Sequence, residues 1–115
     1  MADLPHLVEQ HLTAARASEH GRSAELVLHD GVLRQTMIAL VGGTELAEHN
    51  SPHAASLQVL VGRVRVTGAD AAVLSAGELA LLTHERHAVT ALEDSAFLLT
   101  TVTGVEPAPE PERAR

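Results

Sequence analysis

The chain has 115 residues, which is enough for one domain with a single core, and with one Phe and no Tyr or Trp that core must be aliphatic. Its formal net charge of −7 would repel nucleic acids and anionic membranes. The absence of cysteine excludes disulfides, thiolate metal sites and cysteine nucleophiles, so any transition metal would have to bind imidazole, carboxylate or water. Histidine is therefore the residue type to follow.

The first residues predict a short amphipathic helix. Asp3 can cap its start, apolar residues return at helical spacing as far as Ala15, and Gly21 can end it. We expect His6 and His11 at the surface or edge of this helix rather than in a metal site. The segment has neither the basic start nor the apolar run of a signal peptide, and no stretch reaches the length of a membrane span, so we expect a cytoplasmic protein.

From residue 24 the apolar pattern becomes that of β-strands. Short strands separated by turns rich in Gly, Asp and Ser are predicted at residues 25–29, 32–41, 57–61, 63–67, 72–74, 78–82, 87–92 and 95–103. Residues 48–55 are expected to be irregular because they contain Pro52. With no second helix for parallel crossovers, the pattern favours an antiparallel sandwich or barrel.

The composition also predicts where the domain ends. After Gly104 proline alternates with charged residues, which is typical of a disordered or extended tail. We therefore expect a helix and lead-in over residues 1–22, a β-barrel over residues 23–104 and a disordered Pro/Glu-rich tail over residues 105–115.

Two segments, 49–62 and 77–87, have the spacing of the two motifs of cupins. In the usual first motif two histidines flank one residue, a glutamate follows four positions later and a glycine seven after that; the corresponding residues here are His49, Ser51, Ala55 and Gly62. In the second motif a glycine begins a strand, a proline ends it and a histidine follows; the corresponding residues here are Gly77, Thr83 and His87. Over about residues 3–103 the chain resembles the small single-domain cupins of the RmlC-like jelly-roll superfamily.

The resemblance implies an all-β, antiparallel cupin-type barrel, or jelly roll, with one short N-terminal α-helix. It also implies a metal site, of which His49 and His87 are the two retained positions out of four. Two imidazoles alone hold a metal poorly, but His53 lies four residues after His49 and His84 three before His87. We assign His49, His53 and His87 as candidate ligands of Zn, Ni, Cu, Fe or Mn, and His84 as a candidate substrate contact.

The alternative is a barrel without a native metal. His49 and His87 would then be a polar pair in the barrel mouth, hydrogen-bonded to each other, to Gln58 or to water. A metal bound only adventitiously is a further alternative. No catalytic residue can be assigned in any of these cases.

Strand faces decide which other polar residues contact a ligand. Gln58 shares a face with Ser56 and Leu60, and it is a candidate substrate-binding residue if a bulge near Pro52 turns that face inward; otherwise it lies at the surface. The same question applies to three polar residues on the long strand before it, Arg34, Gln35 and Thr36. The sequence leaves both faces open.

The favoured function is binding of a small, largely apolar or anionic molecule in the barrel, with or without a metal and with no assigned activity. The alternative is a metal-dependent cupin enzyme such as a dioxygenase, and a third is a structural barrel with no ligand. We also expect a homodimer, because the amphipathic helix and the sheet edges need cover, and neither a nucleic-acid nor a membrane partner.

Overall fold

The computed structural model describes residues 1–49, 54–68, 71–82 and 87–102. Within them one helix precedes nine strands: α1 (Leu4–Ala17), β1 (Arg22–Asp30), β2 (Leu33–Leu40), β3 (Glu45–His49), β4 (Ala54–Val61), β5 (Arg63–Val66), β6 (Ala72–Ser75), β7 (Leu79–Leu82), β8 (His87–Ala91) and β9 (Ser95–Val102). Each expected strand is present, and β3 is additional. The prediction of an irregular stretch over residues 48–55 is wrong at both ends, because β3 continues to His49 and β4 begins at Ala54.

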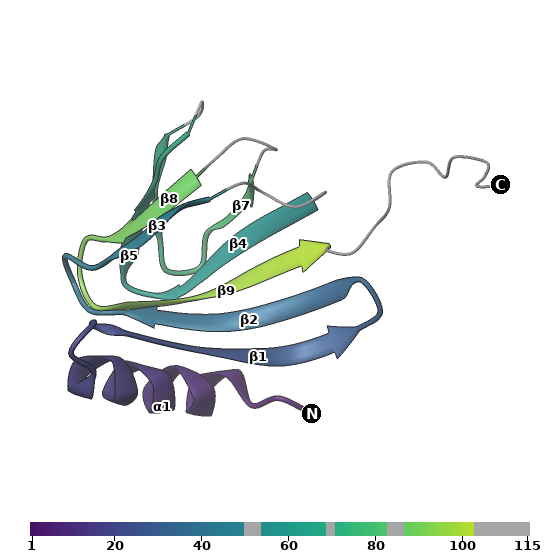
Figure 1. Ribbon diagram of the computed structural model, residues 1–115, viewed down its shortest axis with the longest axis horizontal. Coiled ribbons are helices and arrows are strands. Elements are labelled where there is room, and N and C mark those ends of the chain that lie inside the picture. The colour runs from purple at the N-terminus through teal and green to yellow at the C-terminus, as the bar shows by residue number, and fades with distance from the viewer. Residues whose placement is uncertain (50–53, 69–70, 83–86, 103–115) are drawn as a thin grey trace, which may run out of the picture.

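The strands form two antiparallel sheets that face each other. The order in the five-stranded sheet is β1-β2-β9-β4-β7, and the order in the four-stranded sheet is β3-β8-β5-β6. Figure 1 shows α1 as a third layer beneath the five-stranded sheet. This arrangement confirms the expected all-β jelly roll with one N-terminal helix. Among the described residues no helix is long and apolar enough to cross a membrane.

The helix begins where the sequence predicts. Asp3 is its N-cap, and the Asp3 carboxylate accepts a hydrogen bond of 3.2 Å from the backbone N–H of His6. The helix ends at Ala17, and Gly21 then turns the chain into β1 with a φ of +70° that favours glycine. The apolar stripe of α1 therefore lies on the sheet through Val8, Leu12 and Ala15, which are buried.

His11 corrects the expectation of a surface histidine. It lies in the apolar stripe and is buried, with 6% of its surface exposed. Its Nε2 donates to a carboxylate oxygen of Glu25 at 2.7 Å, and its Nδ1 lies 2.7 Å from the hydroxyl of Ser23, both on β1. Because both ring nitrogens are satisfied, the imidazole can be buried between the helix and the sheet without an unpaired polar atom.

Two cores result from this layering. The inter-sheet core contains aliphatic residues around Phe97: Ile38, Leu40, Leu57, Val59, Val64, Val66, Leu74, Val89 and Ala91. The helix core lies between α1 and the other face of the five-stranded sheet: Val8, Leu12, Ala15, Met37, Ala39 and Ala96. Strand β2 contributes to both cores, so every side chain from Met37 to Leu40 is buried. The sequence therefore shows a continuous apolar run there instead of an alternation.

The end of the sandwich where β8 turns into β9 is closed by backbone contacts. The hydroxyl of Ser95 accepts from the backbone N–H of Arg63 at 3.0 Å and lies 2.6 Å from the carbonyl oxygen of Glu93. Gly62 approaches this turn with a φ of +86°, and a Cβ there would collide with the Ser95 hydroxyl and the carbonyl oxygen of Asp94. Only glycine fits at this position.

Asp94 joins the same turn to the helix. One oxygen of its carboxylate accepts from the backbone N–H of Gly42 at 2.9 Å, and the other accepts from Arg16 at the end of α1 at 2.8 Å. The Gly42 N–H, and next the hydrogen bond from Arg16, hold the pKa of Asp94 below its usual value. The folded state therefore favours the ionised carboxylate.

Replacement of Gly62 by alanine should destabilise the protein far more than replacement of Gly43. Gly43 has a similar φ of +92° but nothing within 4 Å of an added Cβ, so Gly43→Ala is expected to cost about 1 kcal/mol from backbone strain alone. Gly62→Ala adds a collision with backbone atoms and should cost about 3 kcal/mol or more. Urea unfolding measures both, and equal losses would contradict the close approach at Gly62.

The contribution of Asp94 should depend on pH. A lowered folded-state pKa gives stability that is fully present above the ordinary aspartate pKa and is lost as the pH falls through the lower folded value. The difference in free energy of unfolding between wild type and Asp94→Asn should therefore be largest above about pH 5 and should shrink as the pH falls below the ordinary aspartate pKa. The control Glu93→Gln removes the same charge one residue away, and an identical pH profile for the two variants would exclude a specific role for Asp94.

Candidate functional site

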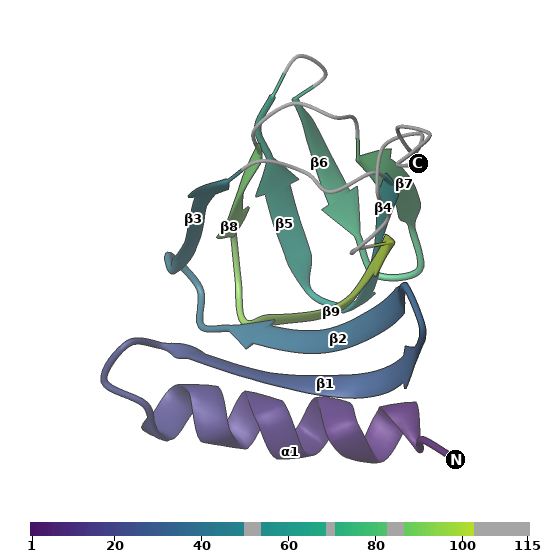
Figure 2. The ribbon, with the colours of Figure 1, turned by 45° about the vertical axis from the view of Figure 1, so that its right-hand side comes forward.

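The strand ends on one side of the sandwich form a mouth that gathers the candidate site residues. In the five-stranded sheet Leu33, Val102 and Ala54 are register neighbours, and Ala55 pairs with Leu82. In the four-stranded sheet His49 pairs with His87. Successive strands run in opposite directions along the sandwich. The strand ends named above therefore all lie at the end of the sandwich opposite the turn that contains Ser95 (Figures 1 and 2).

His87 is the best-defined residue of the mouth. It begins β8 and is buried, with 6% of its surface exposed. Its Nδ1 lies 2.6 Å from the backbone carbonyl oxygen of Thr67, at the end of β5. A carbonyl only accepts, so Nδ1 carries a proton and donates, and Nε2 holds the lone pair whenever the ring is neutral. This is the arrangement in which histidine presents Nε2 to a metal or to a donor group of a ligand.

Thr67 also fixes the backbone at the start of β8. Its hydroxyl accepts from the backbone N–H of Ala88 at 3.0 Å, and its own N–H donates to the carbonyl oxygen of Ala88 at 2.9 Å. The strand that carries His87 is therefore held to Thr67 directly after the imidazole contact. A ring that is buried and anchored in this way keeps one orientation, which is what a binding site requires.

The other sequence-predicted site residues fall into two groups. The backbone of His49, the last residue of β3, pairs with that of His87 across the ladder, so the two retained cupin positions are neighbours. His53 and His84 lie outside the described residues. Among the residues that are described, no three His, Asp or Glu side chains come together as a metal site. The metal assignment to His49, His53 and His87 therefore stays a prediction.

Alternation along β4 shows which way Gln58 faces. Ala55, Leu57 and Val59 are buried toward the inter-sheet core, whereas Gln58 is only partly buried and lies on the opposite face. Its register neighbours Leu79 and Leu98 share this outer face. Gln58 thus lies on the outer face of the sheet, as in the surface alternative. The expected bulge near Pro52 falls outside the described residues, and β4 pairs with β7 without a register shift from Ala55 to Gln58.

On the long strand β2, by contrast, two of the candidate polar residues face the interior of the sandwich. Arg34 pairs with Thr101, and both share the inner face with Thr36 and the core residue Ile38, since β2 and β9 pair without a register shift. Gln35 lies on the outer face, where its amide donates to the Thr100 hydroxyl at 3.0 Å. Arg34, Thr36 and Thr101 therefore stand on the inner face toward the mouth, above the aliphatic core.

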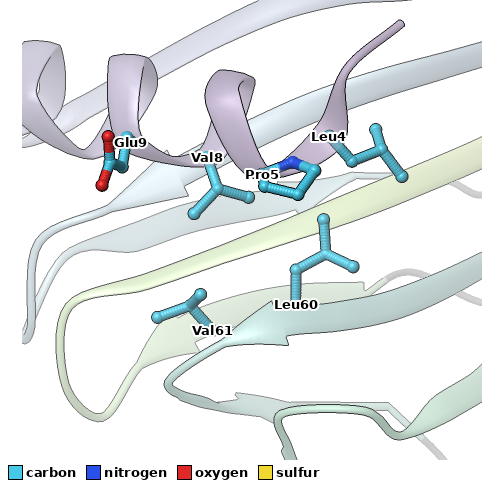
Figure 3. Close-up of a pocket in the computed structure, with 6 residues that line it drawn as sticks. All are labelled: Leu4, Pro5, Val8, Glu9, Leu60 and Val61. Atoms are coloured by element: carbon cyan, nitrogen blue, oxygen red, sulfur yellow. The ribbon is translucent and has the colours of Figure 1, made fainter.

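A separate apolar groove of about 400 Å³ lies between the start of α1 and the end of β4. Figure 3 shows Leu4, Pro5 and Val8 of the helix facing Leu60 and Val61 of the strand, with Glu9 beside them. Ligand sites combine apolar walls with several convergent polar groups, and among the described residues that line this groove Glu9 is the one with a polar side chain. The mouth, with its imidazole, guanidinium and hydroxyl groups, is the better candidate.

Comparison with known proteins supports the fold and leaves the function open. No family model matches the chain, and no curated protein matches it. A conserved protein of unknown function from Streptococcus pyogenes, SPY1581, is 22% identical with a TM-score of 0.68, over 77% of this chain and 80% of that one. A cupin-2 domain protein from Shewanella frigidimarina is 13% identical with a TM-score of 0.68, over 89% of this chain and 94% of that one.

A similar structure also occurs within a larger enzyme. Salicylate 1,2-dioxygenase from Pseudaminobacter salicylatoxidans is 16% identical with a TM-score of 0.72 over 84% of this chain, but the match spans only 33% of the dioxygenase. Cupin-fold structures thus include both proteins of unknown function and enzymes. At these identities the likeness shows the fold alone.

The hydrogen bond between His87 and Thr67 predicts the tautomer of one imidazole. ¹⁵N-edited NMR shows which ring nitrogen of a neutral imidazole carries the proton. In the neutral ring of His87 the proton should be on Nδ1, because the Thr67 carbonyl accepts a hydrogen bond from it. His20, whose side chain is 75% exposed and whose Nε2 lies 3.6 Å from a carboxylate oxygen of Glu19, is the reference for an exposed ring. A His87 ring with a bare Nδ1 would contradict the anchored geometry.

Proposed function

We propose that this chain, which has the cupin fold, binds a small anionic molecule at the mouth of its sandwich, with His87 at the centre of the site. The observation that carries the proposal is the buried imidazole of His87, whose Nδ1 is fixed on the Thr67 carbonyl, so that the ring keeps one orientation at the mouth. An imidazole suits a carboxyl or hydroxyl group of a ligand.

The inner face of β2 and β9 supplies the complementary charge. Arg34 and Thr101 are direct register partners, and Thr36 follows one step further toward the core. A guanidinium beside hydroxyl groups matches carboxylate or phosphate oxygens, and the aliphatic core beneath them matches an apolar body. The ligand class that fits these groups is a small organic acid.

A metal-dependent cupin enzyme is the second candidate, and one observation favours it. His49 and His87 are ladder neighbours, and the Nδ1–H of His87 is bonded to a carbonyl in the way metal-bound histidines usually are. If a divalent metal is held here, His87 binds it through Nε2, and His49 and His53 are the further ligands we propose. Such an ion would act as a Lewis acid toward a chelating substrate. Only two of the four usual cupin ligand positions, His49 and His87, carry histidine in this sequence, which makes metal-free binding the first proposal.

A thermal-shift experiment tests the proposal and separates its two forms. Small mono- and dicarboxylates should raise the melting temperature of the wild type, and His87→Ala should lose at least most of this shift because the central imidazole is gone. His20→Ala, which removes an exposed histidine beyond the far end of α1, should retain it. The shift should also persist in EDTA.

The outcomes discriminate between the alternatives. The metalloenzyme would replace the binding proposal if EDTA abolished the shift and the wild type contained metal. In that case His87→Ala should lose the metal and His20→Ala should keep it. A shift that is the same in both histidine variants would place the ligand elsewhere, and no shift with any acid would remove the ground for an anion site.

A further inference from the structure

A serine, a histidine and a glutamate form one hydrogen-bonded row between α1 and β1. The imidazole of His11 on α1 lies 2.7 Å from the hydroxyl of Ser23 on one side and 2.7 Å from a carboxylate oxygen of Glu25 on the other. Ser23 and Glu25 are two positions apart on β1, so both side chains leave the strand on the same face, along which α1 runs (Figure 2). Hydroxyl, imidazole and carboxylate in this order are the nucleophile, base and orienting group of a serine hydrolase.

The carboxylate determines where the protons lie in this row. A carboxylate only accepts hydrogen bonds, so Nε2 of His11 carries a proton and donates it to Glu25. In the neutral ring Nδ1 then holds the lone pair, and the hydroxyl of Ser23 donates to it. The imidazole is therefore oriented as a base toward the Ser23 proton, in the opposite tautomer to that of His87.

The exposure of the three residues suits these roles. His11 is buried, and the helix around it packs on the sheet through its apolar stripe, so the ring keeps its orientation. Ser23 is only partly buried, and the side chain of Glu25 is 47% exposed. The base is thus held by packing, whereas the hydroxyl that it contacts is open to a small molecule.

The free edge of β1 supplies a hydrogen-bond donor beside Ser23. The N–H of Val41 donates to the carbonyl oxygen of Gly21, and the pairing of β1 with β2 continues in this register past Ser23. Backbone groups alternate in direction along an antiparallel strand, so those of Ser23 face β2 and those of Ala24 face outward. β1 is an edge strand, and in the described part of the chain β2 is its one neighbour in the sheet. In α/β-hydrolases the N–H of the residue after the nucleophile stabilises the oxyanion, and the N–H of Ala24 has this place.

A groove next to the row supplies apolar walls for a substrate. It has a volume of about 410 Å³ and lies between the first turns of α1 and the middle of β1, where Leu7, Val27 and Leu28 line it. Glu25 lines the same groove and also accepts from His11, so the groove adjoins the row. The carboxylate disfavours an anionic ligand, and a neutral ester with an apolar body fits these walls.

We propose that Ser23 is an activated nucleophile that takes the acyl group of small, neutral carboxylic esters, with His11 as its base and Glu25 as the positioning residue. Oγ of Ser23 bonds to the carbonyl carbon of the ester while its proton passes to Nδ1 of His11. The bond from that carbon to the alcohol oxygen then breaks, and the alcohol leaves with the proton from Nδ1. Water hydrolyses the acyl-serine by the same proton route, which releases the acid and restores the hydroxyl. This site lies on the helix side of the five-stranded sheet and does not depend on the ligand of the mouth.

Labelling of the full chain with an alkyl fluorophosphonate tests the nucleophile. The reagent bonds to an activated serine with loss of fluoride, and peptide mass spectrometry identifies the labelled residue. Ser23 should react at least about 100-fold faster than Ser75, which is also partly buried but contacts no imidazole of the described residues. The wild type should also release nitrophenolate from p-nitrophenyl acetate faster than Ser23→Ala does. Equal labelling of the two serines, or no label on Ser23, would overturn the proposal.

Glu25→Gln tests the positioning role of the carboxylate. The amide can donate to Nε2 of His11, which favours the tautomer with the proton on Nδ1, so labelling of Ser23 should slow at least about tenfold. ¹⁵N-edited NMR should show the proton of His11 on Nε2 in the wild type and on Nδ1 in the variant. Glu19→Gln is the matched control, because it removes the same charge from a side chain that is 86% exposed beyond the end of α1.

Glu19→Gln should therefore change neither the labelling rate nor the tautomer, and circular dichroism should be the same for both variants. A labelling rate that Glu25→Gln leaves unchanged, or a wild-type His11 with its proton on Nδ1, would exclude the proposed row of nucleophile, base and carboxylate.

Discussion

Burial of β2 and β9 on both faces is the constraint on which the rest of the structure depends. The helix covers one face of these strands and the four-stranded sheet covers the other, so Met37, Ile38, Ala39 and Leu40 are all enclosed. A one-residue slip in their register would exchange the two cores and bring Arg34 to the helix side. The pairing of β2 with β9, which has no register shift, therefore fixes both the packing of α1 and the direction of every polar residue on these strands.

The same constraint shapes the mouth. It turns Arg34, Thr36 and Thr101 inward, above an aliphatic core, and it leaves Gln35 outside on the Thr100 hydroxyl. His87 enters from the other sheet, and its position depends on a backbone carbonyl of β5, so a change of side chain at position 67 would leave that acceptor in place. The site is thus built from the inner faces of both sheets, and the closed turn around Ser95 holds those sheets together at the opposite end.

A helix of 14 residues covers only part of a five-stranded sheet. It lies on β1, β2 and β9 and reaches Leu60 near the end of β4, whereas Leu79 and Leu81 on the outer face of β7 are exposed. The side of the sheet with polar edge residues is the one that carries the helix, and the apolar edge is the one left open. The helix of one chain therefore covers its side of the five-stranded sheet only in part.

The sequence by itself determined all of the described elements except β3: the helix from its cap and apolar stripe, the other strands from alternation and turn residues, and the cupin fold from two spaced motifs. It did not determine which face of a strand is buried or which distant residues come into contact. Apolar residues occupy both faces of β4, so alternation alone did not show which way the side chain of Gln58 points. The structure shows it, because Leu57 and Val59 lie in the inter-sheet core and Gln58 lies on the other face. His11 looked like a surface residue because its partners Ser23 and Glu25 lie on a strand that only tertiary packing brings beneath the helix. Pairing of His49 with His87 likewise joins strands 38 positions apart in the chain, a contact that no local pattern records.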